Sequence, residues 1–201
     1  ITAAGYTYSE YARRGFGELV AVGLLTLGLL LAMSFATRRE HPAQRGWFNG
    51  LSAALVVLVG VILVSALQRL LLYEAAYGFT RLRTYTHVAI PWMGVLFAAF
   101  LVLLLLGQPR RFAPAVAAGA IGFALTLSLL NVDSFIVRQN AARLAETGRL
   151  DLEYLASLSN DAGPEMVRLA QTRNGAAQAA MLGQLACRAR QLDQQARRAD
   201  L

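Results

Sequence analysis

The sequence predicts an all-α integral membrane protein with four transmembrane helices and a helical extramembrane C-terminal tail. Three observations lead to this prediction. Of the 201 residues, 56% are hydrophobic, and the mean hydropathy of +0.45 is too high for an ordinary soluble domain of this length. Four segments are long and apolar enough to cross a bilayer. The apolar character then stops after Leu130.

The four candidate spans define the expected domain organisation. A helix that crosses a bilayer needs roughly 20 mostly apolar residues. The segments that meet this requirement are 17–36, 50–67, 88–106 and 113–130. The fourth is rich in alanine and glycine, so its surface suits close packing against another helix better than contact with lipid. We therefore expect a transmembrane domain over 1–131, with an N-terminal interfacial segment, and an extramembrane tail over 132–201.

The start of the chain has no recognisable signal peptide. It begins with Ile1, and no short apolar region with a small-residue cleavage site precedes the first span. We therefore expect the chain to be part of a longer polypeptide.

Composition and residue spacing exclude several classes of function. The net charge of +7 is spread over membrane flanks and the tail, without the basic stripe and interleaved aromatics of a nucleic-acid site. The single cysteine, Cys187, excludes an internal disulfide and a cysteine-rich metal site. His41 and His87 are expected on opposite sides of the membrane, so they cannot share a haem or a metal. We expect no cofactor, no metal and no nucleic-acid partner.

The polar C-terminal part is expected to be helical. The fourth span should continue as a helix past the membrane to Gly148. The phrase "LDLEYLASLSNDAGPEMVRLAQT" then predicts two short helices joined at 159–163, with Pro164 at a permitted early position. A final helix over 175–199 carries a narrow apolar stripe that can pack on another part of the chain or on a partner. The leucines of this stripe are Leu182, Leu185 and Leu192.

Ionisable residues gather at one side of the predicted membrane domain. The connections 37–47 and 107–112 are short, which places the stretch 73–85, "YEAAYGFTRLRTY", and the tail on the opposite side. Ionisable residues at membrane depth are costly and raise a functional hypothesis. The candidate polar cluster comprises Glu18, Arg69, Glu74, Arg81, Arg83, His87, Asn131, Asp133 and Arg138.

Two interpretations of this cluster stay open. In the first, the residues line a polar pocket at the membrane surface, covered by a loop over 73–85. In the second, they are interface anchors and ion pairs that fix helix ends, with arginine side chains reaching the headgroups. In both, the density of aromatic rings and opposite charges predicts that the 73–85 loop is ordered and that Glu74 pairs with Arg81 or Arg69.

Three phrases carry a resemblance to a known family: "YTYSEYARRGF", "LYEAAYGFTRLRTY", and "NVDSFIVRQNAARL" followed by "LDLEYLASLSNDAGPEMVRL". In order and spacing they resemble the C-terminal half of an uncharacterised bacterial family of multi-pass membrane proteins, a domain of unknown function of the four-one-seven-three type. The resemblance covers the chain up to about Leu169. It implies larger proteins with further spans upstream, and it carries no activity that could be transferred. The residues that it assigns to recurring phrases are Tyr8, Glu10, Tyr11, Arg13, Tyr73, Glu74, Tyr77, Gly78, Arg83, Asn131, Asp133, Arg138 and Asn140.

Two functions from different classes are compatible with the sequence. The leading one is a non-catalytic integral membrane subunit or scaffold, which docks a partner complex through one membrane face and through the leucine stripe of its tail. Its expected partners are the lipid bilayer and other membrane-protein subunits, or the upstream half of the same polypeptide. The alternative is a transporter or membrane enzyme whose polar site consists of Glu18, Arg69, Glu74, Arg81 and Asp133.

The expected location is the bacterial cytoplasmic (inner) membrane. Short loops next to spans are the most reliable carriers of the positive-inside signal. The two short loops hold five arginines: Arg38, Arg39, Arg45, Arg110 and Arg111. The other side holds more arginines in total, spread over longer segments, so raw counting favours the opposite answer. Giving weight to loop density, we expect the short loops to be cytoplasmic and the tail and the 73–85 loop to be extracytoplasmic.

Overall fold

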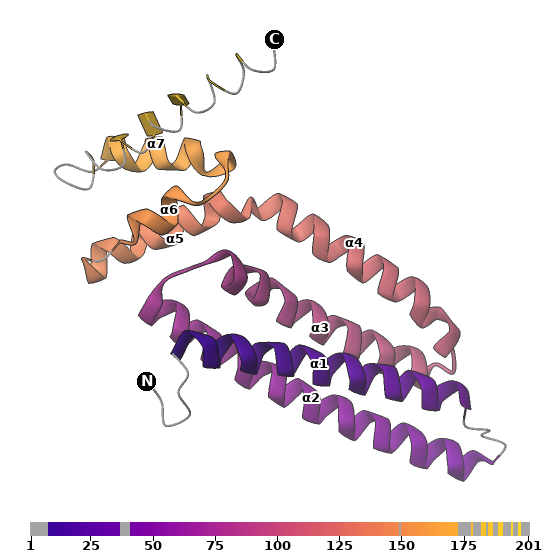
Figure 1. Cartoon of the computed structure of the whole chain (residues 1–201). Helices are drawn as coiled ribbons and strands as arrows, with labels where there is room; N and C mark the ends of the chain where they lie inside the picture. Colours follow the sequence, from indigo (N-terminus) through magenta and orange to yellow (C-terminus); the bar gives the residue numbers. More distant parts are fainter. Residues whose placement is uncertain are drawn as a thin grey trace. The chain divides into compact units, whose positions relative to one another are not determined.

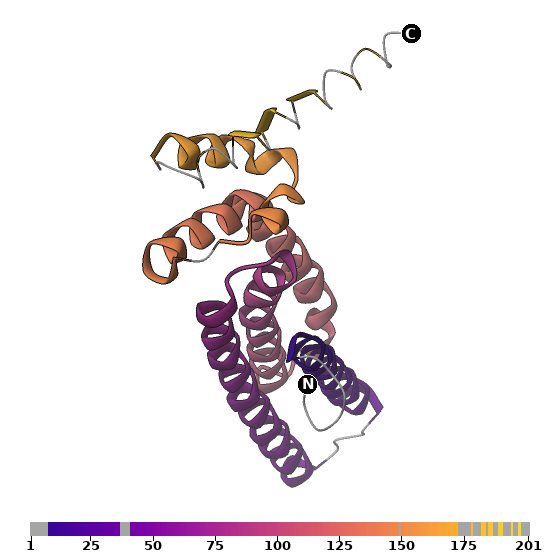
Figure 2. The ribbon, with the colours of Figure 1, turned by 60° about the vertical axis from the view of Figure 1, so that its left-hand side comes forward.

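The structure is a computed structural model that describes residues 8–36, 41–148 and 150–172, together with positions 178, 182, 183, 185, 186, 189, 190, 194 and 197 of the tail. These residues are helical or form the connections between helices, and they contain no strand (Figures 1 and 2). The all-α prediction is therefore confirmed. The elements are α1 (Tyr8–Ala36), α2 (Pro42–Tyr77), α3 (Arg81–Leu105), η1 (Pro109–Arg111), α4 (Phe112–Leu130), α5 (Val132–Thr147), α6 (Leu152–Ala156), η2 (Asn160–Ala162) and α7 (Gly163–Thr172).

The chain divides into two compact units. The first consists of Ile1–Leu67 and Ala89–Phe123, and the second of Gln68–Val88 and Ala124–Leu201. The long helices α2, α3 and α4 each contribute to both units. The second unit therefore contains the end of α2, the start of α3 and all of α5 to α7.

Three helical segments are long and apolar enough to cross a membrane: Pro42–Tyr77, Arg81–Leu105 and Pro109–Leu130. They contain the second and fourth predicted spans in full and the third, 88–106, as far as Leu105, and they indicate a lipid bilayer as the surroundings of this part of the chain. The first predicted span, 17–36, belongs to α1, whose side chains are described only in part. Within the described side chains of α1, the apolar stretch is Ala21–Ser34. The described residues therefore contain three segments that could cross a membrane, fewer than the four predicted, and the first span stays a prediction.

Close helix packing in the first unit occurs at glycines of α4. A Cβ atom added at Gly122 would lie 2.1 Å from Cη2 of Trp92, and one added at Gly119 would lie 2.9 Å from Cδ2 of Leu96. Because Trp92 and Leu96 belong to α3, these two helices approach each other where α4 has no side chain. This contact agrees with the packing role expected for the alanine- and glycine-rich fourth segment.

The second unit is built around α5. The helix α4 ends at Leu130, and Asn131 follows in a left-handed conformation with φ 45°. The Asn131 side chain accepts a hydrogen bond from the Ser134 N–H and so caps the N-terminus of α5. The prediction of one continuous helix to Gly148 was therefore wrong, because Asn131 interrupts it. The predicted end was right: Gly148 has φ 67° and terminates α5.

The short helices α6, η2 and α7 fold back on α5 and enclose a small hydrophobic core. The prediction of two short helices with Pro164 in an early position is confirmed by α6 and α7. Partly buried Phe79, from the connection between α2 and α3, packs against this core. The buried core residues are Ile136, Val137, Leu155, Leu158, Ala162, Met166, Leu169 and Ala170.

The stretch 73–85 is mostly helical, contrary to the prediction of a loop. The helix α2 extends to Tyr77 and α3 begins at Arg81, so only three residues, 78–80, connect them. Gly78 has φ 78°, a conformation that ends a helix at little cost only for glycine. The aromatic and charged residues on both sides of it continue the two helices, and their side chains project from helix ends.

Candidate functional site

A set of polar side chains in the second unit ties the α2–α3 connection to α5 and α6. We call this set the junction cluster. It contains Tyr73, Glu74, Arg81, Arg83, His87, Asp133, Asn140, Arg143, Tyr154 and Ser159.

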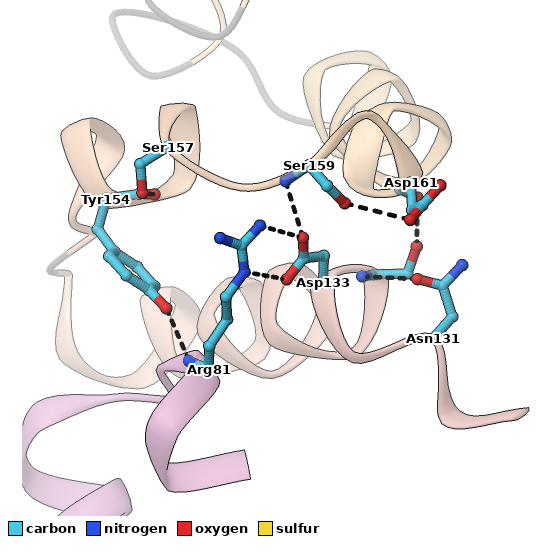
Figure 3. Close-up of polar contacts among 8 residues, drawn as sticks. Arg81, Asn131, Asp133, Tyr154, Ser157, Ser159 and Asp161 are labelled. Atoms are coloured by element: carbon cyan, nitrogen blue, oxygen red, sulfur yellow. Dashed lines mark hydrogen bonds and ion pairs between the residues drawn. The ribbon is translucent and has the colours of Figure 1, made fainter. Parts of the chain in front are cut away.

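The ion pair between Arg81 and Asp133 forms the centre of this cluster (Figure 3). Arg81 lies at the start of α3 and Asp133 in the first turn of α5. The guanidinium donates two hydrogen bonds to the carboxylate, Nε to Oδ1 at 2.7 Å and Nη2 to Oδ2 at 2.5 Å. Asp133 Oδ2 also accepts the backbone N–H of Ser159 at 2.7 Å, and the Tyr154 hydroxyl accepts the backbone N–H of Arg81 at 2.7 Å. One buried carboxylate thus connects α3, α5 and the segment after α6.

The environment shifts the pKa values of three groups in this part of the cluster, and the hydrogen bond to Asp133 raises the pKa of Arg81. The hydrogen bond from Arg81 lowers the pKa of Asp133 strongly; burial opposes this effect, and the bonds from Ser159 add to it. Burial raises the pKa of Tyr154, although the N–H of Arg81 acts in the opposite direction. Asp133 is therefore ionised and Tyr154 is neutral at physiological pH.

Two arginines cap the C-terminus of α2. The last carbonyl groups of a helix lack intrahelical donors, and they carry partial negative charge. Arg143 of α5 donates from Nε to the Ala75 carbonyl at 2.8 Å and from Nη2 to the Ala76 carbonyl. Arg83 of α3 donates to the carbonyls of Tyr77, at 3.3 Å, and Gly78. The end of α2 is thus held by side chains from two other helices.

The connection between α2 and α3 is held on α5 by Asn140. Its Oδ1 accepts the N–H of Phe79 and its Nδ2 donates to the Phe79 carbonyl, both at 2.9 Å. The Phe79 ring lies edge-on to Phe135, with 5.5 Å between ring centroids. A Cβ atom added at Gly78 would lie 2.5 Å from Asn140 Oδ1. Gly78 is therefore required both for its positive φ and for the close approach of Asn140.

The Glu74–His87 pair differs from the rest of the cluster. Glu74 Oε2 lies 3.1 Å from His87 Nδ1, and the Glu74 side chain is only 2% exposed. The other carboxylate oxygen, Oε1, has no hydrogen-bond partner among the described residues. The predicted partners of Glu74 were Arg81 or Arg69, and this pairing was wrong. Arg81 instead bonds Asp133, and the three-residue connection brings His87 of α3 next to Glu74.

The structure brings part of the predicted polar cluster together. Arg81 pairs with Asp133, Glu74 with His87, and Arg83 places its guanidinium 4.5 Å from the centroid of the Tyr73 ring. The remaining members take part in none of these three contacts. Asn131 caps α5, Arg69 and Arg138 are exposed, and Glu18 belongs to the first unit with a side chain outside the described part.

The leucines of the tail have different surroundings. Leu185 packs against the core of the second unit, so it contacts its own chain. Leu182 is 50% exposed. Leu192 and Cys187 lie outside the described residues.

Sequence reasoning missed the roles of Asn140, Arg143, Tyr154 and Ser159. A signal for two of them was present. Asn140 and Arg143 follow Asp133 at helical spacing, on the face of α5 that also carries the buried Ile136 and Val137. Polar residues on a buried face need partners, which marks them as contacts to another element. No comparable pattern marks Tyr154 and Ser159.

The described part of the chain contains no candidate metal-binding site. There, no group of three or more histidine, cysteine, aspartate or glutamate side chains could hold a metal ion. The junction cluster instead offers ion pairs, caps on carbonyl groups and two buried carboxyl groups, those of Glu74 and Asp133.

Comparison with known proteins gives a family and no activity. Residues 1–169 match the family described as domain of unknown function DUF4153. The resemblance seen in the sequence named a different type, four-one-seven-three, and the match corrects that type. The class, an uncharacterised domain, and the extent to Leu169 agree with the resemblance. No curated protein and no solved structure matches the chain.

The Arg81–Asp133 pair should stabilise the second unit in a pH-dependent way. A carboxylate whose pKa is lowered on folding contributes stability above its unfolded pKa of about 3.9, and this contribution is lost as the pH falls below that value. Because the Arg81 side chain is 40% exposed, we expect a coupling of only about 1 kcal/mol. Thermal unfolding in detergent should place Asp133→Asn about 2–4 °C below wild type at neutral pH. The gap should narrow as the pH falls below about 4.

The control for this experiment is Arg138→Gln, which removes an exposed charge from the same helix. It should change the unfolding temperature little, because exposed substitutions typically stay within about 0.5 kcal/mol. A double-mutant cycle with Arg81→Gln isolates the pair. Additive effects of Arg81→Gln and Asp133→Asn would contradict the coupling.

Gly78→Ala should destabilise the chain more than Gly148→Ala. Both glycines have positive φ, so each substitution carries the cost of the left-handed conformation, roughly 1 kcal/mol. Only at Gly78 does the new Cβ meet a neighbour, since nothing lies within 4 Å of a Cβ at Gly148. We expect an additional loss of about 1 kcal/mol or more at Gly78. Equal unfolding temperatures for the two variants would show that Asn140 does not depend on this close approach.

Proposed function

The chain belongs to the DUF4153 family of unknown function, and on that premise we propose that it is a non-catalytic integral membrane subunit or scaffold. It docks a partner complex through one membrane face and through its helical tail. The main observation behind this proposal is that the polar side chains of the junction cluster bind other groups of the same unit. Arg81, Arg83, Asp133, Asn140 and Arg143 are all engaged in fixing helix ends and connections within the second unit.

Such an arrangement supports a structural role. A residue that binds or transforms a substrate must have polar groups that are free to contact the substrate. The side chains named above instead form hydrogen bonds and ion pairs with backbone carbonyls, backbone amides and one another. Together they give the second unit a fixed conformation with its own hydrophobic core. A fixed surface beside membrane helices is suited to holding a partner in place.

The proposed setting is the bacterial cytoplasmic membrane. Three helices support a membrane location, and the segment 17–36 is proposed as a fourth span that completes the bundle. The proposed partners are other membrane-protein subunits or an upstream half of the same polypeptide. In the tail, the exposed Leu182 is the described residue that is available for such contact, with Leu192 as a further member of the stripe.

A transporter or membrane enzyme is the second candidate, and one observation favours it. Glu74 is buried on a helix of membrane-crossing length, and one of its oxygens has no partner among the described residues. Ionisable groups in such positions mark transport or proton pathways in many membrane proteins. Arg81 and Asp133 of the predicted polar site support this candidate less, because they bind each other.

Native electrophoresis of the tagged protein, extracted from its own membrane with a mild detergent, tests the scaffold role. We expect the chain to migrate in an assembly with defined protein subunits. Leu182→Arg should reduce that assembly about tenfold, which corresponds to about 1.4 kcal/mol. The matched control is Gly183→Arg, which adds the same charge at the next position of the tail. Migration of the wild type as an isolated chain, or equal loss in both variants, would contradict docking through Leu182.

The orientation of the chain is tested with its single cysteine. We propose that the short loops are cytoplasmic and that the tail faces outward, so Cys187 should react with a membrane-impermeant thiol reagent in intact cells. Labelling of the unfolded protein controls for the reactivity of the thiol. Modification that requires permeabilised membranes would reverse the assignment.

A further inference from the structure

We propose that Glu74 and His87 form a proton-binding site at the α2–α3 connection. In this site the Glu74 carboxyl group is protonated and donates a hydrogen bond to His87 Nδ1. This inference is independent of the scaffold role. It rests on two observations about the pair: its contact, with Oε2 and Nδ1 3.1 Å apart, and the lack of any partner for Oε1 among the described residues.

Burial determines the protonation state of the carboxyl group. The Glu74 side chain is 2% exposed and lies on a helix long and apolar enough to cross a membrane. An ionised carboxylate in such a place is stable only when both oxygens receive hydrogen bonds or a close counter-charge. Here one oxygen receives none from the described residues. As a neutral acid, Glu74 keeps an ordinary carbonyl oxygen at Oε1, which costs far less to bury.

The charged groups around Glu74 leave this assignment intact. His87 and Arg83, both from α3, are the two that act on its carboxylate. Arg83 donates hydrogen bonds to the carbonyls of Tyr77 and Gly78, and its guanidinium lies over the Tyr73 ring. From α5, Arg143 donates to the carbonyls of Ala75 and Ala76. Both arginines are thus directed to the end of α2.

His87 gives the buried carboxyl group a route to the outside. The His87 side chain is 38% exposed, and its second ring nitrogen, Nε2, remains for exchange with the surroundings. A proton that binds at Nε2 allows the Nδ1 proton to pass to Glu74 Oε2, which leaves a neutral imidazole and a neutral carboxyl group. Histidine is the side chain best suited to such exchange near neutral pH. The site therefore binds one proton, with Glu74 as its store and His87 as its entry.

Infrared spectroscopy of the full chain in lipid vesicles tests the site. With ¹³C-labelled glutamate, we expect the carbonyl stretching band of a protonated glutamic acid at about pH 7, which should disappear at alkaline pH. Glu74→Gln should remove this band, whereas Glu153→Gln, at an exposed position of α6, should retain it. Absence of the band in wild type, or its persistence in Glu74→Gln, overturns the proposal. The wild-type spectrum decides the first point even if a variant misfolds.

The role of His87 is tested in the same spectra. His87→Gln should shift the pH at which the band disappears by one unit or more, a tenfold change in proton concentration, while His41→Gln should leave it unchanged. The chain has only these two histidines, so ¹⁵N-histidine resonances in the His41→Gln background report His87 alone. An unchanged midpoint in His87→Gln overturns the pairing. If sodium or magnesium ions remove the band at constant pH in wild type, the occupant is a cation, and the proton assignment fails.

Discussion

The constraint on which the second unit depends is that the backbone carbonyls at the end of an apolar helix need hydrogen-bond donors. Water can supply them at the end of a helix in a soluble protein, but in membrane surroundings the donors must come from the protein or from headgroups. At the end of α2 they come from Arg83 and Arg143, on α3 and α5. Residues from three helices are therefore fixed at the end of α2. On the same face of α5, Asn140 binds the backbone of Phe79 and Asp133 accepts the backbone N–H of Ser159.

This constraint also explains why "YEAAYGFTRLRTY" is so dense in aromatic and charged residues. It supplies the end of one helix, a three-residue connection and the start of the next, and each part needs a different partner. Gly78 provides the positive φ and the space for Asn140, and Phe79 anchors the connection on Phe135. Arg81 binds Asp133, whereas Arg83 binds carbonyl groups at the end of α2. Of the two interpretations of the polar cluster, anchors that fix helix ends describe Arg81, Arg83 and Asp133 well.

The sequence was sufficient to predict features that depend on local chemistry. Hydropathy located α2, α3 and α4, Gly148 marked the end of α5, and Pro164 marked the start of α7. The same reasoning failed where one residue overrides its surroundings, as when Asn131 breaks the helix between α4 and α5. Pairing could not be predicted, because several arginines compete for few carboxylates and the choice depends on the rotation of each helix. A loop over 73–85 would have allowed Glu74 to reach Arg81, whereas a three-residue connection directs it to His87.

Glu74 is an exception within a region whose other polar groups are well satisfied. Among the described buried side-chain atoms, two have no partner, Asn49 Oδ1 and Glu74 Oε1. Burying an amide oxygen without a hydrogen bond costs a modest amount of free energy, whereas burying an ionised carboxylate oxygen without one costs much more. The two atoms are therefore not equivalent. Folded proteins that satisfy polar groups consistently tend to leave exceptions where function requires them. Arg83, four residues from His87 on α3, could have been directed to Glu74 and is instead directed to the end of α2. The carbonyl groups at the end of α2 thus receive their hydrogen bonds from Arg83 and Arg143. The hydrogen-bond partner of the Glu74 carboxyl group is His87, a side chain that can exchange a proton with it.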